Sequence, residues 1–537
     1  MTVKTFIANP NGVSIEQDAI IYGDYTPLGR LQYVQLATSP NLTPYISTDA
    51  ASKPGLVRWV INTTAPVQGP SWVNFSIQNY DPGPFANNIV YPQDFGAVGD
   101  GITDDTAAIQ AALDAASSGG VVLFPRGIYL VSAGLTCPYS GVILQGVGGV
   151  SGKEGYTPVN GAVLLASSDA FTTHEPIILF GTTSSSDIIL GSGISRLNVN
   201  CNGVADGVWL ASDDQGFAID CFIVSAYSCG LYAVAFSAGG VDSVRFTRCK
   251  VAETGDGTNS LGDIGTPQAA IALGQNVYYG VIDKCSTISS AVDGTIIGNP
   301  TPGAGESDGC KIIGCNSDTT AGNQFAVYSG DNHVVANNTT FNPAGKSALF
   351  LSGGGNHVIS GNFFEGSNNA NNQTGGTGAI IYNSGGRDIV VVGNVIGESS
   401  AIGHATAGIY EEGVNTAPGS LYVNNSLLGC VEASVTPVIV QGSTVSLWRD
   451  NPGYNPVGLE TVAVPASGSA TAALPYDATF YITASTSTVA CAVTDAGGTS
   501  QTVATIPSSG FGAVFVPAGS TLTPTYTVAP TWTVQGH

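Results

Sequence analysis

Acidic residues are the groups in this sequence with the clearest capacity for catalysis. Glu365 lies three residues beyond Asn362, and Glu398 lies four residues beyond Asn394. If the two asparagines begin equivalent segments of a repeating fold, the two carboxyl groups lie on neighbouring segments. Cleavage of a glycosidic bond requires one protonated carboxylic acid and one carboxylate that acts as base or nucleophile. Glu365 and Glu398 are therefore the leading catalytic pair.

Other carboxylates are catalytic candidates for the same chemistry, and solvent exposure explains each of them when it is taken singly. Glu253 is expected on a strand just after a cysteine turn, whereas Asp256, Asp331, Asp213, Asp214 and Glu411 fall in loops. Two residues are candidates for contact with the substrate. His404 follows Glu398 in the next loop, and Trp532 lies in the last part of the chain.

A basic cluster offers a different reaction. Arg245, Arg248 and Lys250 lie beside Asp242. Removal of a proton in β-elimination needs a base, and a cation must neutralise the uronate of the substrate. Ordinary surface charge explains the cluster more simply, so a lyase is the alternative to a hydrolase.

A repeat indicates how these side chains are positioned. Between about residues 195 and 430, an apolar residue, two small or polar residues and then Cys or Asn recur, at intervals from 23 residues (Cys315 to Asn338) to 36 residues (Cys249 to Cys285). Variable insertions in a repeat of this size are typical of solenoids. Each coil reads strand, loop, strand, tight turn, strand, with coils stacked about 4.8 Å apart. The turn residues are Cys221, Cys249, Cys285, Cys315, Asn338, Asn362, Asn394 and Asn425.

Stacking places equivalent residues above one another, which predicts ladders. Asn tolerates left-handed backbone and forms hydrogen bonds to its neighbour in the next coil. The cysteines of the same column are expected to be buried free thiols, because one column cannot supply tetrahedral metal geometry. His333 and His357 are expected to form a structural ladder as well. Carboxylates on adjacent coils lie about 5 Å apart, which suits a retaining glycosidase, and about 10 Å separates alternate coils, which approaches the inverting geometry.

The segment from Tyr91 to Tyr129 reads YPQDFGAVGDGITDDTAAIQAALDAASSGGVVLFPRGIY. Side chains of residues 103–106 can cap a helix, whose apolar stripe would consist of Ile109, Ala112, Leu113 and Ala116. The order DFGAVGDGxTDDTxAIQxAL followed by VxFPxGxY resembles the opening of the pectate-lyase-like, right-handed parallel β-helix proteins. Many members are bacteriophage tailspikes and other polysaccharide-degrading enzymes. The resemblance implies an all-β, right-handed parallel β-helix whose N-terminal end is closed by a capping helix at 103–117.

The same resemblance gives a domain plan. Residues 1–90 correspond by position to a virion-attachment region, 91–450 to the β-helix, and 451–537 to a β-rich, sandwich-like domain for trimerisation or glycan contact. The implied protein is a homotrimeric phage tailspike. Its partners would be a bacterial surface polysaccharide and, through the N-terminal region, a phage tail or baseplate protein. A non-catalytic receptor-binding spike is the further alternative.

Composition narrows the partners and the location. The formal net charge of −23 disfavours nucleic acid, because a surface that binds phosphates must be basic. No apolar run resembles a signal peptide or spans a bilayer, so we expect synthesis in a host cytoplasm, a place in the virion and no membrane insertion. No phosphate loop, HExxH or GxSxG elbow is present in its required context, so no cofactor is expected; structural Ca²⁺ stays open.

Overall fold

The protein is described by a computed structural model in which two compact units are separated at Asn87 and Asn88. The structure describes residues 2–8, 14–20, 35–36, 45–46, 57–61, 74–79 and 89–536, except for 118, 149–160, 169–170, 172–174, 184–186, 237–239, 256–267, 299–304, 342–344, 366–378, 398–404, 406, 413–418, 433–438, 441–445, 453–458, 461 and 475–476.

The first unit contains two small sheets. Strands β1 (Thr2–Ala8), β2 (Ser14–Ile20) and β3 (Gln35–Leu36) form one antiparallel sheet. In the other sheet, β6 (Asn74–Asn79) lies between β4 (Tyr45–Ile46) and β5 (Val57–Ile61).

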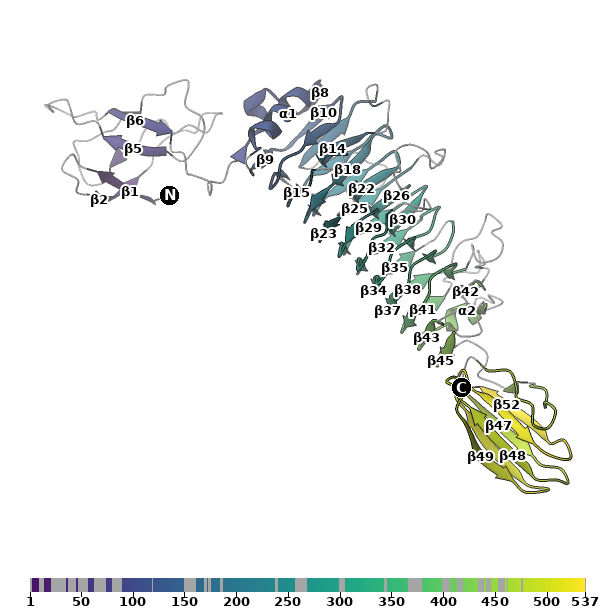
Figure 1. Cartoon of the computed structure of the whole chain (residues 1–537). Helices are drawn as coiled ribbons and strands as arrows, with labels where there is room; N and C mark the ends of the chain where they lie inside the picture. Colours follow the sequence, from purple (N-terminus) through teal and green to yellow (C-terminus); the bar gives the residue numbers. More distant parts are fainter. Residues whose placement is uncertain are drawn as a thin grey trace. The chain divides into compact units, whose positions relative to one another are not determined.

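Three long parallel sheets build most of the second unit, and Figure 1 shows their strands stacked coil upon coil. We name them sheets I, II and III in the order in which each coil visits them. Sheet I has 13 strands and sheets II and III have 11 each. Sheet I consists of β7 (Ile89–Val90), β9 (Val121–Phe124), β12 (Ile143–Gly146), β16 (Gly193–Ser195), β20 (Phe217–Ile219), β24 (Arg245–Thr247), β28 (Val281–Asp283), β31 (Lys311–Ile313), β34 (Val334–Ala336), β37 (Val358–Ser360), β40 (Val390–Val392), β43 (Leu421–Val423) and β45 (Leu447–Arg449).

Sheet II consists of β8 (Asp100–Asp104), β10 (Gly127–Val131), β13 (Ala162–Ala166), β17 (Asn198–Asn200), β21 (Phe222–Val224), β25 (Lys250–Ala252), β29 (Ser286–Ile288), β32 (Asn316–Asp318), β35 (Thr339–Phe341), β38 (Phe363–Glu365) and β41 (Val395–Gly397). Sheet III consists of β11 (Leu135–Cys137), β14 (Pro176–Gly181), β18 (Asp206–Ala211), β22 (Cys229–Val234), β26 (Ala269–Leu273), β30 (Asp293–Ile297), β33 (Phe325–Val327), β36 (Leu349–Leu351), β39 (Ile381–Asn383), β42 (Ile409–Glu411) and β44 (Ile439–Val440). Neighbouring strands within each sheet are parallel and come from successive coils, for example β34 with β37 and β36 with β39. The predicted parallel β-helix is confirmed.

Short elements complete this part of the chain. Strand β15 (Ile189–Leu190) pairs with β19 (Asp213–Asp214), and β23 (Val241–Asp242) pairs with β27 (Val277–Tyr278). Helix α2 (Leu428–Glu432) follows β43 in the chain. Among the described residues, no helix combines the length and the apolar character that crossing a membrane requires.

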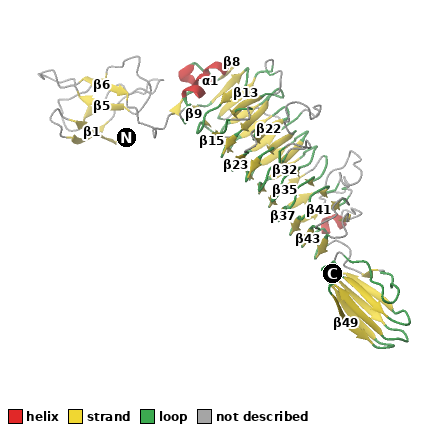
Figure 2. Cartoon of the chain, viewed as in Figure 1, coloured by secondary structure: helices red, strands yellow, loops and turns green. Residues whose placement is uncertain are grey.

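Helix α1 (Thr106–Ala115) follows the 3₁₀ helix η2 (Pro92–Phe95) and strand β8, and Figure 2 shows it beside the first strands of the coil. Its predicted apolar stripe is confirmed, because Ile109, Ala112, Leu113 and Ala116 are fully buried in the same core as the coil. The helix is shorter than the predicted 103–117, because residues 100–104 pair with β10 as a strand.

The predicted capping by residues 103–106 holds for one carboxylate and fails for its neighbour. Asp104 Oδ1 accepts a hydrogen bond from the Thr106 amide at 3.0 Å. Asp105, the residue before the helix, makes no capping bond. Its carboxylate instead accepts the amides of Val98 (2.6 Å) and Gly99 (3.0 Å), which fixes the glycine-rich loop onto the helix start.

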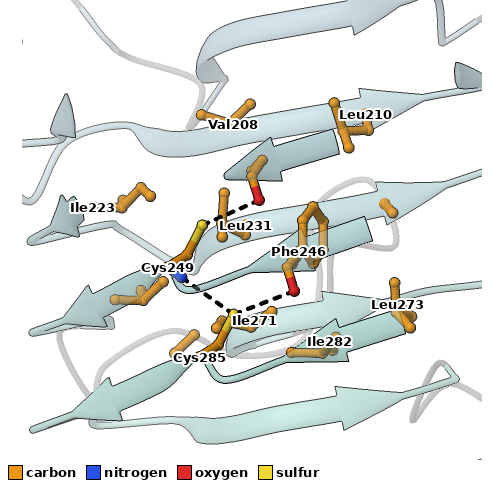
Figure 3. Packing of buried hydrophobic residues seen from close by; sticks show 14 of the residues in the cluster. Val208, Leu210, Ile223, Leu231, Phe246, Cys249, Ile271, Leu273, Ile282 and Cys285 are labelled. Atoms are coloured by element: carbon orange, nitrogen blue, oxygen red, sulfur yellow. Dashed lines mark hydrogen bonds between the residues drawn. The ribbon is translucent and has the colours of Figure 1, made fainter. Parts of the chain in front are cut away.

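The core lies inside the coil, where apolar side chains from successive strands pack together (Figure 3). Cys249 and Cys285 belong to this core, and the Cys249 amide donates to Cys285 Sγ at 3.4 Å. Their own thiols donate to the carbonyl oxygens of Ala218 (3.3 Å) and Phe246 (3.4 Å). The ten cysteines are all buried and free, so the predicted column of thiols is confirmed.

The asparagine ladder is confirmed at the turn between sheets I and II. Asn338 Nδ2 donates to Asn362 Oδ1 at 3.0 Å, and Asn362 Nδ2 donates to Asn394 Oδ1 at 2.8 Å. The ladder continues through Asn425 to Asn451. The residue before each ladder position has positive φ, where Gly and Asn are least strained. These residues are Arg196, Asp220, Arg248, Lys284, Gly314, Asn337, Gly361, Gly393, Asn424 and Asp450.

The histidine ladder is confirmed at the turn that precedes sheet I. The His333 and His357 rings are stacked, with centroids 5.1 Å apart. His333 Nδ1 accepts the Cys310 amide (3.1 Å), and His357 Nδ1 accepts the His333 amide (3.3 Å). The Nε2 atoms contact the carbonyl oxygens of Ser329 (3.0 Å) and Gly353 (3.1 Å). Both ring nitrogens are therefore occupied, and a neutral ring protonated on Nε2 satisfies every bond.

The last part of the chain forms two antiparallel sheets around a small core. One sheet has the order β46 (Leu459–Glu460), β52 (Thr531–Gly536), β47 (Ala478–Thr483), β50 (Phe511–Val516); the other has the order β49 (Ser500–Ile506), β48 (Val489–Thr494), β51 (Thr521–Thr525). Buried residues of both sheets, such as Phe480 and Val489, share one core, in agreement with the predicted sandwich-like domain.

Candidate functional site

The outward face of sheet III carries the candidate site. Side chains alternate along a strand, so Leu349, Ile381 and Ile409 enter the core while the next residue of each strand points outward. The register places these outward residues in one column, with Phe350 beside Tyr382 and Tyr382 beside Tyr410.

Four aromatic rings form a continuous row on this face, three from the successive strands β36, β39 and β42 and one, Tyr328, from the residue just after β33. Ring centroids are 5.5 Å apart for Tyr328 and Phe350, 5.3 Å for Phe350 and Tyr382, and 5.6 Å for Tyr382 and Tyr410. Tyr382 is largely buried between its neighbours, and the other three rings are partly exposed. We call Tyr328, Phe350, Tyr382 and Tyr410 the aromatic row.

A carboxylate is held against one end of the aromatic row. Glu412 Oε2 accepts hydrogen bonds from Ser384 Oγ and Tyr382 OH, both at 2.7 Å. These bonds lower the pKa of Glu412, with the bond from Ser384 contributing most. The side chain is partly exposed, so the row ends in an ionised acceptor at neutral pH.

A second carboxyl group lies at the other end. Asp293 Oδ1 accepts the Asn323 amide at 2.7 Å, and Asp293 Oδ2 accepts a short hydrogen bond from Tyr328 OH. Asn323 Nδ2 donates to the same Tyr328 oxygen at 3.3 Å. Burial raises the pKa of Asp293, although the hydrogen bonds and the charge of Lys346 act in the opposite direction.

Of the sequence-predicted catalytic pair, Glu365 lies among the described residues. Glu365 ends β38, where the chain leaves sheet II towards sheet III, and its exposed fraction is 7%. Its amide donates to Thr340 Oγ1 at 2.7 Å. The register pairs Glu365 with Gly397, one residue before Glu398. Glu398, Asp256 and His404 lie outside the described residues.

Three other predicted carboxylates accept hydrogen bonds from the neighbouring coil. Asp331 Oδ1 accepts the Gly355 amide (2.6 Å), and Asp214 Oδ1 accepts the Asp242 amide (2.7 Å). Glu253, expected on a strand, lies after β25 with a φ of 55°, and its Oε2 accepts Ser225 Oγ at 3.0 Å. These contacts link neighbouring coils.

Two carboxylates expected in loops are buried instead. Glu411 lies in β42 with its side chain inside the coil, 1% exposed, and its Oε1 accepts Ser446 Oγ at 2.6 Å and Tyr422 OH at 3.4 Å. Asp213 lies in β19 and is fully buried, which raises its pKa to about 8. Their strands turn the side chains inward, so neither reaches the outward face.

Trp532 contributes to the core of the last domain. Its indole Nε1 donates to the Val462 carbonyl oxygen at 2.7 Å, and its ring packs edge-on against Phe480 at 5.2 Å. Among the described residues, no group of three or more His, Cys, Asp or Glu side chains is arranged to hold a metal ion.

Residues 89–220 match the family model for rhamnogalacturonase A/epimerase, pectate lyase-like. This part of the chain is similar to the pectate lyase-like family. The match to curated proteins is short: 44 residues are 64% identical to mannuronan C5-epimerase AlgE5 of Azotobacter vinelandii, which covers 8% of this chain and 4% of the epimerase. The chain therefore spans only a small part of that relative.

Solved structures resemble a larger share of the chain. DFA-IIIase from Arthrobacter chlorophenolicus A6 aligns with 67% of this chain and 93% of its own, at 14% identity and a TM-score of 0.50. ORF18 of Geobacillus virus E2 aligns with 90% of this chain and 89% of its own, at 15% identity and a TM-score of 0.46. At such identities the likeness concerns the fold.

The aromatic row lies beyond the segment that defines the pectate lyase-like domain, and sequence reasoning did not find it. Phe350 and Tyr382 each precede a ladder asparagine by 12 residues, Asn362 and Asn394 respectively. Counting 12 residues back from each of these two asparagines would have placed Phe350 and Tyr382 at equivalent positions of neighbouring coils. Asp293 also had a signal, because Asp-Gly opens its strand as it opens the strand at Asp206.

Proposed function

We propose that this protein binds a bacterial surface polysaccharide along the aromatic row and hydrolyses a glycosidic bond within it. The observation that carries the proposal is the row itself: three rings on successive strands of sheet III and Tyr328 just after a fourth strand, with Glu412 and Ser384 beside Tyr382. Polysaccharide-acting relatives of the pectate lyase-like domain support the same substrate class, as the name of the matched mannuronan epimerase illustrates.

The geometry of the row suits an extended polymer. Successive strands are about 4.8 Å apart, so a chain running along the coil axis meets a new ring at each strand. Aromatic rings offer apolar area at low entropic cost, and the Tyr hydroxyls and Glu412 supply the few polar groups that orient a ligand. Sugar rings present apolar C–H faces and hydroxyl edges, which match this combination.

For hydrolysis, Glu365 and Glu398 remain the proposed acid and base or nucleophile. Glu365 ends β38 at the edge of sheet II that leads to sheet III. The general acid protonates the leaving glycosidic oxygen, and the second carboxylate activates water or attacks the anomeric carbon. Glu253, Asp256, Asp331, Asp213, Asp214 and Glu411 follow as reserve candidates, and His404 and Trp532 are proposed as substrate contacts.

The test is incubation of the full chain with purified surface polysaccharide, followed by assays for new reducing ends and for the ultraviolet absorbance of unsaturated uronates. Reducing ends without absorbance are expected. Glu365→Gln and Glu398→Gln should each reduce their release at least about 100-fold, because each removes a proton-transfer group. Asp283→Asn, a carboxylate of sheet I, is the matched control and should retain activity. Full activity in both Gln variants would show that Glu365 and Glu398 are not the catalytic pair.

Binding without cleavage is a second candidate, favoured by one observation. The described carboxylates Asp331, Asp214 and Glu253 are engaged in hydrogen bonds between coils. Retention of polysaccharide without new reducing ends would establish this alternative. A lyase has less support, because Arg245 lies on sheet I and Arg248 is paired with Asp220 at 2.6 Å.

We also propose that the protein is a homotrimeric phage tailspike whose N-terminal region attaches to the tail. The resemblance of residues 91–129 to tailspike-type β-helices supports this assignment. Sedimentation equilibrium of the full chain tests it, with a mass of three chains expected. A monomer that still cleaves polysaccharide would contradict the tailspike assignment and leave the enzymatic proposal intact.

A further inference from the structure

The charges on the outward face of sheet III bear on which polysaccharides fit there. Glu412 is ionised at neutral pH, since the hydrogen bonds from Ser384 and Tyr382 favour its charged form. Both hydrogen bonds end on Oε2. A ligand over the aromatic row therefore meets a carboxylate at the Tyr382–Tyr410 end, and Asp293 contributes a second carboxyl group beside Tyr328.

The strands that carry the aromatic row are free of cationic side chains, although one lysine lies close to its Tyr328 end. The six strands β26, β30, β33, β36, β39 and β42 of sheet III contain no Lys or Arg, as their described sequences show. Lys346, which precedes β36, is the cation whose charge acts on Asp293. Sheets I and II and the turn between them carry Arg196, Arg245, Arg248, Lys250, Lys284 and Lys311.

This separation of charge has a cost for anionic ligands. Two like charges about 4 Å apart repel each other and weaken binding. The loss of affinity is about 5-fold in a water-like environment and up to about 1,000-fold near a protein surface, where the effective dielectric constant is lower. A polyuronate brings one carboxylate on every sugar residue, so it cannot bind along the row without placing one near Glu412. A neutral polymer offers hydroxyl donors to the same carboxylate instead.

We infer that the aromatic row selects polysaccharides that carry no anionic groups, and that Glu412 is the residue that excludes the anionic ones. The inference rests on the proposed function, because it concerns the ligand of the same face. It adds a chemical class to that ligand: a neutral glycan whose hydroxyl groups donate to Glu412 while its apolar faces lie on Phe350 and Tyr410.

The experiment compares two forms of one polymer. Affinity electrophoresis of the full chain is run through gels containing polygalacturonate or the same polymer after reduction of its carboxyl groups to neutral sugars. A panel of purified bacterial surface polysaccharides, neutral and anionic, is run in parallel. The proteins are wild type, Glu412→Gln, which keeps the size and an acceptor oxygen, and Asp283→Asn, which removes one charge from sheet I. Circular dichroism verifies that each variant is folded.

Wild type is expected to bind neutral polymers at least about 5-fold more tightly than their anionic counterparts at low salt. Glu412→Gln should reduce that ratio to below about 2-fold, and Asp283→Asn should leave it unchanged. Preferential binding of anionic polymers by wild type, or an unchanged ratio in Glu412→Gln, would overturn the inference while supporting polysaccharide binding. Failure to retain any polymer of the panel would instead count against the proposed function.

Discussion

Acidification should destabilise this protein through its histidine ladder. His333 and His357 are fully buried, and each uses Nδ1 as an acceptor for a backbone amide. Protonation of either ring destroys that acceptor and buries a charge. Burial, with the neighbouring His357 as a further cause, lowers the pKa of His333 from 6.5 to about 4. Burial also lowers the pKa of His357.

The sign and size follow from linkage. The unfolded chain takes up a proton near pH 6.5, whereas folded His333 resists protonation until about pH 4. Stability from this group is complete above pH 6.5 and is lost as the pH falls through that window. A difference of 6.5 − 4 at 1.36 kcal/mol per pH unit gives a loss of about 3 kcal/mol from His333, and His357 adds to it.

Urea unfolding followed by circular dichroism at several pH values between 7 and 4 measures this loss. His333→Asn retains an acceptor near the Nδ1 position without a titrating ring, so its stability should depend less on pH over the window. Asn338→Ala is the control, because it weakens the neighbouring ladder without changing any titrating group. Its pH dependence should match wild type. If His333→Asn loses stability on acidification as steeply as wild type does, the histidine ladder is not the acid-sensitive element.

Two further predictions concern stability. Asn362→Ala should lower the free energy of unfolding by about 2–4 kcal/mol, since Asn362 makes hydrogen bonds in both directions along the ladder and unsatisfied buried partners are costly; urea unfolding beside the exposed Asn316→Ala checks this, and equal losses would contradict it. Asp213→Asn should stabilise the protein by roughly 3–5 kcal/mol at pH 8, because burial raises the pKa of Asp213 to about 8 and its ionisation therefore opposes folding as the pH rises from about 4. Stability curves of wild type and variant should converge at pH 4, and a more stable wild type at pH 8 would contradict this explanation.

The turn between sheets I and II could be predicted because its requirements are local and repeated. A left-handed residue followed by Asn or Cys satisfies the same geometry in every coil, so Asn338 and Asn362 are recognisable without knowing the loops. Helix α1 was predictable for a similar reason, since Ile109 and Leu113 follow helical spacing. Its start was misplaced because residues 100–104 pair with β10 as a strand.

The candidate site was harder to predict because its residues come one from each coil. Phe350, Tyr382 and Tyr410 are separated by loops of different length, so only the register aligns them. Tyr328 joins them from the residue after β33, whose strand residue Ala326 is the register partner of Phe350. The pair Glu365 and Glu398 was predicted by counting from the ladder asparagines, from which the two residues lie three and four positions away. The pair stays a prediction, because Glu398 lies outside the described residues.

Each coil makes its sheet hydrogen bonds with the coil before it and the coil after it, which makes the body modular. Strand β31 pairs with β28 on one side and β34 on the other, through Val281, Lys311 and Val334. Deletion of residues 311–333 would bring Val334 next to Val281, so that β34 would pair with β28 in the place of β31. Length could thus change by whole turns through duplication or loss of gene segments, and the span of surface offered to a long polymer would change in steps of about 4.8 Å.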